Sequence, residues 1–194
     1  MRNAEIKRKT LETDVSVAIE LDGSGKYVID TSVPFLDHML NLTTKHGLFD
    51  LNIKATGDIN IDYHHLIEDI GLTLGEAILK ASGDRIGIKR YGHAIIPMDE
   101  TLAEVVLDMG GRPFLVYEPL IHSGRIMDIE VAIFEDFFRA LSNSAMINLH
   151  IIVRHGRDLH HIYEAIFKAF GRALDNALTI DSRVKGLPTT KGRL

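Results

Sequence analysis

Two five-residue stretches of this sequence each place two histidines ahead of a glutamate. They are HHLIE at His64–Glu68 and HHIYE at His160–Glu164, ninety-six residues further along the chain. Imidazole nitrogens and carboxylate oxygens are ligands of manganese, iron, cobalt and zinc ions. One such stretch alone would be explained best as a structural histidine pair at the start of a helix. Because the pentad occurs twice, we favour a metal site.

Helical geometry predicts how each pentad would bind metal. On a helix, Glu68 lies one turn from both histidines and shares their face. Adjacent residues point about 100° apart, so His64 and His65 do not readily hold one ion together. Either histidine can join Glu68 at one ion while its neighbour points toward a second. The pattern therefore predicts two metal ions and a site assembled from several segments.

The duplication identifies one further ligand in each half. His38 lies in FLDHM at residues 35–39, and the corresponding stretch IFEDF at residues 133–137 places Asp136 opposite it. Taken alone, Asp136 is equally well explained as a solvated helix residue. With it, each half offers four nitrogen or oxygen ligands and leaves positions for water or substrate. Such an octahedral set favours manganese, with iron, zinc or cobalt as alternatives.

The composition excludes several classes of function. The chain has 194 residues, of which 45% are hydrophobic and 25% charged, as in globular proteins with a sizeable core. It has no cysteine, which rules out disulfides and thiolate metal sites and fits a reducing cytoplasm. Residues 1–10 lack the apolar segment of a secretory signal, and apolar runs are too short to cross a membrane. A net charge of −5 argues against binding to nucleic acid.

The elements that must position these ligands form an α+β pattern that is made twice. In the first half we expect strands and helices in alternation, with residues 22–25 as the turn of a hairpin whose returning strand is 26–30. The expected strands are 5–21, 26–30, 48–55 and 59–63 in the first half and 102–108, 114–117 and 147–153 in the second. The expected helices are 35–46 and 64–81 in the first half and 128–143 and 160–178 in the second.

An internal duplication accounts for this pattern. Setting His64 on His160 also aligns Gly75 with Gly171 and Ala77 with Ala173. We expect a first repeat at residues 1–84, a second at 85–180 and a substrate-binding tail at 181–194. Each repeat would form a small sheet with helices packed on one face. Asp99 and Asp108 are interpreted as structural, and four phenylalanines as core residues: Phe134, Phe137, Phe167 and Phe170.

Several motifs resemble those of the imidazoleglycerol-phosphate dehydratases. They are FLDHM at 35–39, DYHHLIED at 62–69, PMDE at 97–100, GRP at 111–113, HHIYEAIFKAF at 160–170 and LPTTKG at 187–192. The resemblance covers essentially the whole chain, and the two HHxxE pentads in this order are highly specific. The sequence differs at Asp136, where a histidine is usual, and at the Thr-Thr pair of LPTTKG, where two serines are usual.

The resemblance implies a fold, a metal content and an assembly. The fold is a duplicated four-stranded sheet with two helices on one face, of the ribosomal protein S5 domain 2-like type. Each active site would hold two Mn²⁺ ions, and trimers would assemble into a 24-mer with active sites at subunit contacts. One ion would take His38, His65, Glu68 and His160, and the other His64, Asp136, His161 and Glu164.

The resemblance also implies the reaction, which is the dehydration of D-erythro-imidazoleglycerol phosphate to imidazole acetol phosphate in histidine biosynthesis. A carboxylate or histidine must take a proton from carbon; the candidates are Glu12, His46, Glu68 and Glu164. Glu12 also matches a substrate-contacting residue of the family. Lys168 breaks the repeat, since its partner is Leu72. Residues at positions expected to bind phosphate are Arg90, Arg112, Lys168, Thr190, Lys191 and Gly192.

Two other functions remain as alternatives. A dinuclear-metal phosphoester hydrolase on the same scaffold would keep the metal ligands. A non-catalytic shell would use metals only to join subunits, but such a shell has no need of a basic phosphate pocket. Lys168 and Lys191 therefore argue against the shell.

Overall fold

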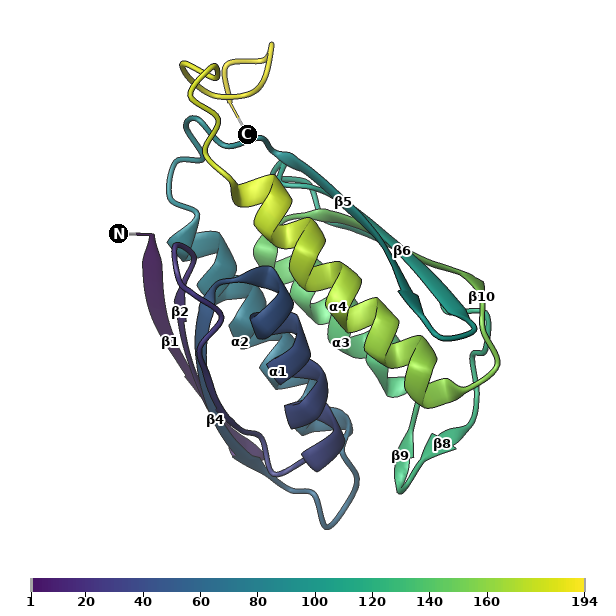
Figure 1. Cartoon of the computed structure of the whole chain (residues 1–194). Coiled ribbons are helices and arrows are strands. Elements are labelled where there is room, and N and C mark those ends of the chain that lie inside the picture. The colour runs from purple at the N-terminus through teal and green to yellow at the C-terminus, as the bar shows by residue number, and fades with distance from the viewer. Residues whose placement is uncertain (1, 194) are drawn as a thin grey trace.

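Two four-stranded sheets enclose four helices in the computed structural model, which describes residues 2–193 (Figure 1). The first sheet has the order β1 (Asn3–Lys9), β2 (Thr13–Glu20), β4 (Asp50–Gly57) and β3 (Tyr27–Asp30). The second has the order β5 (Tyr91–Met98), β6 (Thr101–Asp108), β10 (Asn148–His155) and β7 (Phe114–Glu118). The helices are α1 (Pro34–Gly47), α2 (His64–Ala81), α3 (Ile133–Ala145) and α4 (Leu159–Leu178), and a hairpin joins β8 (Arg125–Ile126) to β9 (Ile129–Glu130).

The two sheets have the same topology, which confirms the expected α+β fold and its internal duplication. In each sheet an antiparallel hairpin, β1–β2 or β5–β6, is followed by a strand antiparallel to its second member. The edge strand then runs parallel to that third strand, as β3 does with β4 and β7 with β10. No helix among residues 2–193 combines the length and the apolar character needed to cross a membrane.

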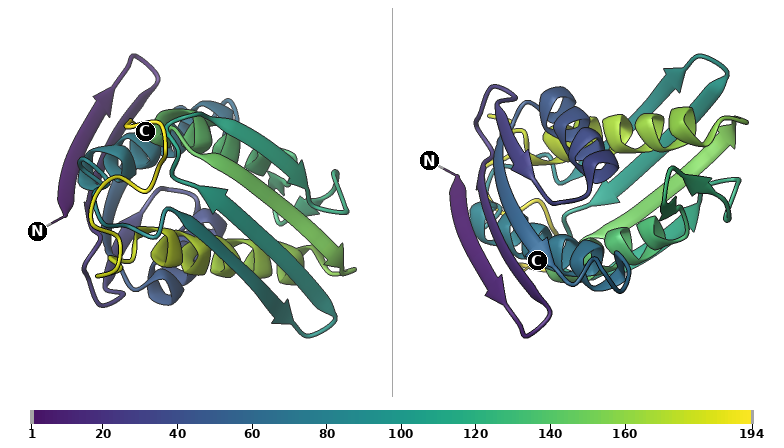
Figure 2. Two further views of the ribbon diagram at one scale, coloured as in Figure 1. Left: turned by 90° about the horizontal axis from the view of Figure 1, so that it is seen from above. Right: turned by 90° about the horizontal axis from the view of Figure 1, so that it is seen from below.

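The helices form the interior of the molecule. In Figures 1 and 2, α1 and α2 cover one face of the first sheet while α3 and α4 cover one face of the second. Across the middle, α2 packs on α3 and α1 packs on α4. The four phenylalanines expected in the core are all buried there: Phe134, Phe137, Phe167 and Phe170. Each pair of contacting helices therefore comes from different repeats.

Strand pairing in the first half differs from the expectation in two places. Residues 5–21 are not one strand, because Thr10 Oγ1 accepts hydrogen bonds from Glu12 N and Thr13 N and turns the chain between β1 and β2. The hairpin predicted for residues 26–30 is also wrong. Asp50 Oδ1 accepts from Ser24 N at 2.7 Å and from Lys26 N at 2.9 Å, so the chain crosses β4 before β3 begins. In the second half, β7 likewise pairs with β10 rather than β6.

Two further element predictions were wrong, and one strand was missed. Residues 59–63 form a turn rather than a strand, with Ile59 and Ile61 exposed. The helix expected at 128–143 begins later, at Ile133, because the residues before it pair as β8 and β9. Strand β5 was missed because its inward positions are the small residues Gly92 and Ala94, which give no strong apolar period.

Glycines let the helices of the two repeats approach closely. A Cβ at Gly75 of α2 would lie 2.6 Å from the carbonyl oxygen of Leu141 in α3. The aligned residue of α4, Gly171, is tighter still, since a Cβ there would overlap the Thr43 carbonyl oxygen of α1. Beside it, Thr43 Oγ1 donates a hydrogen bond to Phe167 O at 3.0 Å. These contacts set the spacing of α1 from α4 and of α2 from α3.

We expect Gly171→Ala to lower the free energy of unfolding by about 1–3 kcal/mol, because a methyl group at this contact must push the two helices apart. Chemical denaturation measures the change. Gly186→Ala is the matched control, since a Cβ there meets no atom within 4 Å. Equal stability of the two variants would contradict a tight contact between α1 and α4.

Candidate active site

Both histidine pairs form the first turn of a helix, and all four helices begin at one end of the molecule. Strand β3 is parallel to β4, so α1 and α2, which follow them, start at the same edge of the first sheet. The same holds for α3 and α4 after β7 and β10 (Figure 1). Asp62 Oδ1 accepts from His64 N at 2.7 Å, and Asp158 Oδ1 accepts from His160 N at 2.8 Å. Asp158 is the N-cap residue of α4, whereas Asp62 comes one residue before Tyr63, the N-cap residue of α2, and holds the backbone at the start of that helix.

The first cluster joins α1 of one repeat to α4 of the other. Glu164 Oε2 lies 3.2 Å from His160 Nε2 and 3.5 Å from His38 Nε2. The carboxylate is largely buried, with 10% of its side chain exposed. Burial acts to raise the pKa of Glu164, but the hydrogen bond and charge of Lys168, together with His160 and His38, outweigh it and lower the pKa. The carboxylate is therefore kept ionised.

The second cluster is the equivalent arrangement with the repeats exchanged. His64 of α2 lies 3.8 Å from Glu68 through Nε2 and 3.8 Å from Asp136 of α3 through Nδ1. Asp136 thus occupies the place that His38 has in the first cluster. The second cluster is more open, with 42% to 49% of each of its three side chains exposed.

The second histidine of each pair points away from these clusters and meets a different carboxylate. His65 Nδ1 lies 3.0 Å from Asp58 Oδ2 and 3.8 Å from Glu12 Oε2. His161 Nδ1 lies 2.8 Å from Glu100 Oε2. The hydrogen bond that His65 donates to Asp58 raises the pKa of His65, and the hydrogen bond that His161 donates to Glu100 raises the pKa of His161.

Within a single chain, the eight expected metal ligands are grouped differently from the two sets of four that the family resemblance implies. Glu68 lies with His64 rather than with His65, and Glu164 lies with His160 rather than with His161. Each second histidine instead contacts a carboxylate of another segment. The division between ions stays a prediction.

Most of the residues expected to bind phosphate gather at the opposite end of the molecule. Arg90 is held by Asp108, with contacts of 2.6 and 3.0 Å, and donates to Pro188 O at 2.9 Å. Arg112 and Lys191 are exposed, and neither has an ion pair among residues 2–193. The pocket is lined by Arg90, Tyr91, Gly110, Gly111, Arg112, Pro188, Thr189, Thr190, Lys191 and Arg193. This anion pocket, as we call it below, has a strong positive charge.

Three expected site residues lie outside the anion pocket. Lys168 is in the middle of α4, where it donates to Glu164 and lies 3.7 Å from Met98 Sδ. His46 is near the end of α1, where partial burial and then the charges of Lys168 and Arg172 lower its pKa. Gly192 lies in a neighbouring hollow with Arg85 and Gly111.

The donor chemistry fits divalent metal ions. The ligand atoms of His38, His160 and Glu164 all lie within 4.8 Å of one another, and so do those of Glu12, Asp58 and His65. Ligands about 2.1 Å from a shared ion are separated by roughly 3 Å when they are adjacent around it. The 3.2 Å separation between His160 and Glu164 is close to that value. Mixed nitrogen and oxygen donors without sulfur suit manganese, iron or zinc.

Comparison with known proteins identifies the family. The family model for imidazoleglycerol-phosphate dehydratase matches residues 31–174, which include both pentads. The chain belongs to this family. It is 57% identical to the imidazoleglycerol-phosphate dehydratase of Thermodesulfovibrio yellowstonii, covering 99% of each chain, and 53% identical to that of Bacillus subtilis, covering 100% of each.

Solved structures of the dehydratase family have the same fold. The Staphylococcus aureus imidazoleglycerol-phosphate dehydratase superposes with a TM-score of 0.83 at 40% identity, covering 92% of this chain and 99% of that one. The Pyrococcus furiosus protein superposes with a TM-score of 0.81 at 35% identity, covering 97% of this chain and all of the other.

Asp58, Glu100 and Arg193 were missed as site residues. Glu100 lies in the PMDE motif, which was assigned to the family without a role for its glutamate. Asp58 follows β4 as part of an ordinary Gly-Asp turn, and no sequence spacing links it to His65. Arg193 is near the end of the tail, where the basic residues gave only a general expectation of anion binding.

We expect the His161 ring in metal-free protein to titrate above its ordinary pKa of 6.5, because Glu100 stabilises the imidazolium. Glu100 is ionised throughout this range, since the His161 hydrogen bond and the Asp158 amide lower its pKa to about 2. For a raised histidine pKa, the stabilisation is complete below the unfolded-state pKa and is lost as pH rises through the folded-state value. Histidine NMR of wild type and Glu100→Gln measures the shift, and an unchanged pKa would contradict it.

Proposed function

We propose that this chain catalyses the dehydration of imidazoleglycerol phosphate to imidazole acetol phosphate, a step of histidine biosynthesis. It is a hydro-lyase of the dehydratase family. The observation that carries this conclusion is the pair of histidine–carboxylate clusters formed by the two pentads that the family model spans. A basic pocket suited to a phosphate monoester accompanies them.

We further propose that two Mn²⁺ ions, or other divalent metals, bind at these clusters. The eight ligands would be His38, His64, His65, Glu68, Asp136, His160, His161 and Glu164. A bound divalent ion acts as a Lewis acid that polarises the imidazole ring of the substrate and orients it. The chain supplies imidazole nitrogens and carboxylate oxygens as ligands, and the lowered pKa of Glu164 keeps that carboxylate ionised.

The length of α4 supports an active site shared between subunits. His160 is at the start of this helix, whereas Arg90 N donates to Ala177 O near its end. Seventeen residues of helix span about 25 Å at 1.5 Å per residue. A small phosphate substrate cannot bridge that distance, so the anion pocket and the clusters of one chain would act on different substrate molecules. A second copy would supply the missing half of each site.

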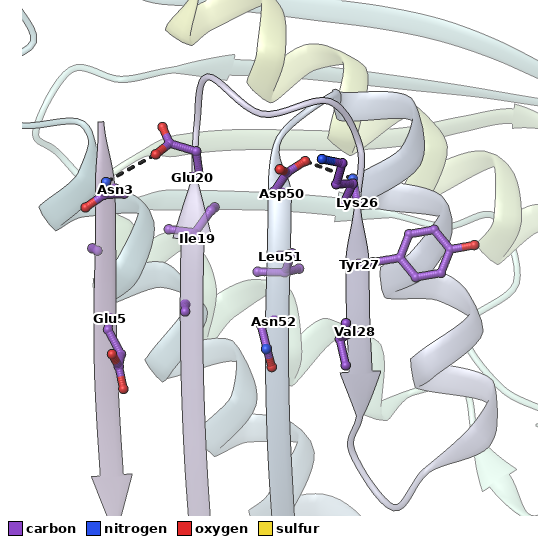
Figure 3. A pocket seen from close by; sticks show the side chains of 12 residues that line it. Asn3, Glu5, Ile19, Glu20, Lys26, Tyr27, Val28, Asp50, Leu51 and Asn52 are labelled. Carbon is purple, nitrogen blue, oxygen red and sulfur yellow. Dashed lines mark hydrogen bonds between the residues drawn. The ribbon is translucent and has the colours of Figure 1, made fainter. Parts of the chain in front are cut away.

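The outer faces of the two sheets also support self-association. On the first sheet this face is polar, with Glu5, Glu20 and Asn52 on neighbouring strands (Figure 3). On the second sheet the equivalent face exposes large apolar side chains, namely Tyr91, Ile95, Val106 and Phe114. An apolar sheet face on one of two otherwise equivalent repeats is suited to contact with another subunit. We propose the 24-mer of trimers as the assembly.

Within the anion pocket, the residues have different parts in binding phosphate. Asp108 and the Pro188 carbonyl fix the Arg90 guanidinium and neutralise part of its charge. Arg112 and Lys191 keep their charge and face solvent, so they would bind the phosphate oxygens directly. Thr190 adds a hydroxyl to the lining. Arg90 therefore stabilises the anion pocket, whereas Arg112, Lys191 and Thr190 would bind the phosphate.

Glu12 is the residue best placed to move a proton. The proton lost lies on a carbon beside an alcohol and is weakly acidic, so a positioned base must take it. Glu68 and Glu164 are committed to the clusters, and His46 lies two turns along α1 from His38. Glu12 is 57% exposed, at 3.8 Å from His65. Its carboxylate is thus free to meet a substrate beside that ring.

The alternatives lack such support. The family model that matches residues 31–174 is that of a dehydratase, which favours dehydration over phosphoester hydrolysis on the same metal ligands. A non-catalytic shell protein would have no use for the anion pocket or for the exposed carboxylate of Glu12 beside His65. We place the enzyme in the cytoplasm, which agrees with its lack of cysteine.

Turnover should depend on metal. Protein stripped by a chelator is expected to give no imidazole acetol phosphate, and added Mn²⁺ should restore formation of the product. Asp136→His exchanges a carboxylate for an imidazole and should change the Mn²⁺ concentration needed for half-maximal activity. A folded protein that forms no product with any divalent metal would overturn the proposed dehydratase activity.

Sharing of the site can be tested with two inactive variants, Glu12→Gln and Arg112→Ala. Assemblies formed from an equal mixture of the two chains should regain about a quarter of wild-type activity, because each contributing chain is intact at its own position half of the time. Each variant assembled alone is the control. If the site lies within one chain, the mixture will stay as inactive as its components.

A further inference from the structure

The second histidine of each pair already has one ring nitrogen engaged. His65 Nδ1 is 3.0 Å from Asp58 Oδ2, and His161 Nδ1 is 2.8 Å from Glu100 Oε2. An ionised carboxylate only accepts hydrogen bonds, so Nδ1 of the neutral ring carries the proton and Nε2 keeps its lone pair. Among residues 2–193, the one carboxylate within 4 Å of His161 Nε2 is that of Asp99, at 3.8 Å, which is too far for a hydrogen bond.

The two carboxylates are themselves held in place. Glu100 Oε1 accepts from Asp158 N at 3.0 Å and from Arg157 N at 3.3 Å, which ties the β5–β6 turn to the start of α4. Asp58 is anchored through its backbone, since its N–H donates to Glu12 O at 3.1 Å. Its side chain is 17% exposed. Each histidine is thus fixed by a group whose own position is set by neighbouring backbone.

The two repeats reach the same contact by different routes. Glu100 directly precedes Thr101, the first residue of β6, just as Glu12 directly precedes Thr13, the first residue of β2. In the second repeat this glutamate bonds the histidine. In the first repeat Asp58, from the connection between β4 and α2, bonds His65 instead. The two carboxylates come from positions that do not correspond in the two repeats. The duplication alone therefore does not explain why each second histidine contacts a carboxylate.

We propose that Asp58 and Glu100 are positioning residues that keep His65 and His161 in the tautomer protonated at Nδ1, with Nε2 available to bind a metal ion. The inference rests on the proposed metal dependence of the enzyme. Carboxylates that bond the second nitrogen of a ligand histidine fix its tautomer and orientation, and their loss weakens metal binding by roughly 10- to 100-fold.

Glu100→Gln tests the proposal with little change in shape. The amide oxygen can still accept from the two backbone N–H groups, which leaves the amide nitrogen to donate to His161 Nδ1. The ring should then carry its proton on Nε2, where a metal would bind. Asp58→Asn is the corresponding change for His65 and serves as an independent second variant. Asp14→Asn is the control, because it removes a carboxylate paired with Lys9 and not with a histidine.

Two measurements are needed, of which the first requires no metal. Solid-state nitrogen NMR of ring-labelled, metal-free protein should show His65 and His161 protonated at Nδ1, with His161 switched to Nε2 in Glu100→Gln. Calorimetric titration with Mn²⁺ should show one class of site weakened 10- to 100-fold in each variant and unchanged affinity in Asp14→Asn. Thermal unfolding of each variant checks that the fold is kept.

The outcomes separate this inference from the proposed function. Nε2-protonated rings in the wild type, or folded Glu100→Gln and Asp58→Asn variants that bind Mn²⁺ as tightly as wild type, would overturn the positioning role alone. Wild-type protein that binds no divalent metal would overturn both. A switched tautomer together with weakened binding is the result we expect.

Discussion

The close packing of helices from one repeat against helices of the other is the constraint on which both clusters depend. His38 reaches His160 and Glu164 only because α1 lies against α4 at Gly171. Asp136 reaches His64 by the same arrangement of α3 on α2. Both clusters are built on the same kind of contact between two helices. A small change in the distance between α1 and α4, or between α2 and α3, would therefore move the side chains of the corresponding cluster apart.

A second constraint follows from the adjacency of the two histidines. Since adjacent helical residues diverge, the two histidines of each pair point in different directions. The first histidine meets a carboxylate four residues later, whereas the second is held by Asp58 or Glu100 from a different segment. The proposed metal ligands thus lie at the starts of helices, and the anion pocket lies at the far end of the same scaffold.

Local patterns in the sequence were enough to predict the four helices, the duplication and the pentads. They could not predict the position of β3, because parallel pairing with β4 depends on Asp50 reaching back to the turn at Ser24. The sequence placed Lys168 with Arg90 as phosphate ligands, but spacing along a chain does not show that a helix separates them. Glu100 was missed for a related reason, since it contacts His161 from a distant part of the sequence. Asp58 is only seven residues from His65, but nothing in the sequence of the intervening turn shows that it folds back onto the ring.

Each cluster draws residues from both repeats, and this has a consequence for the origin of the chain. A protein of half this length would carry only part of each cluster and could complete it only as a dimer, with the present contact between α1 and α4 as its interface. Joining two such copies made that association independent of concentration. The two halves could then differ in sequence, so that one has Lys168 where the other has Leu72. Likewise Glu100 contacts the ring of His161 at 2.8 Å, whereas the equivalent Glu12 lies 3.8 Å from His65.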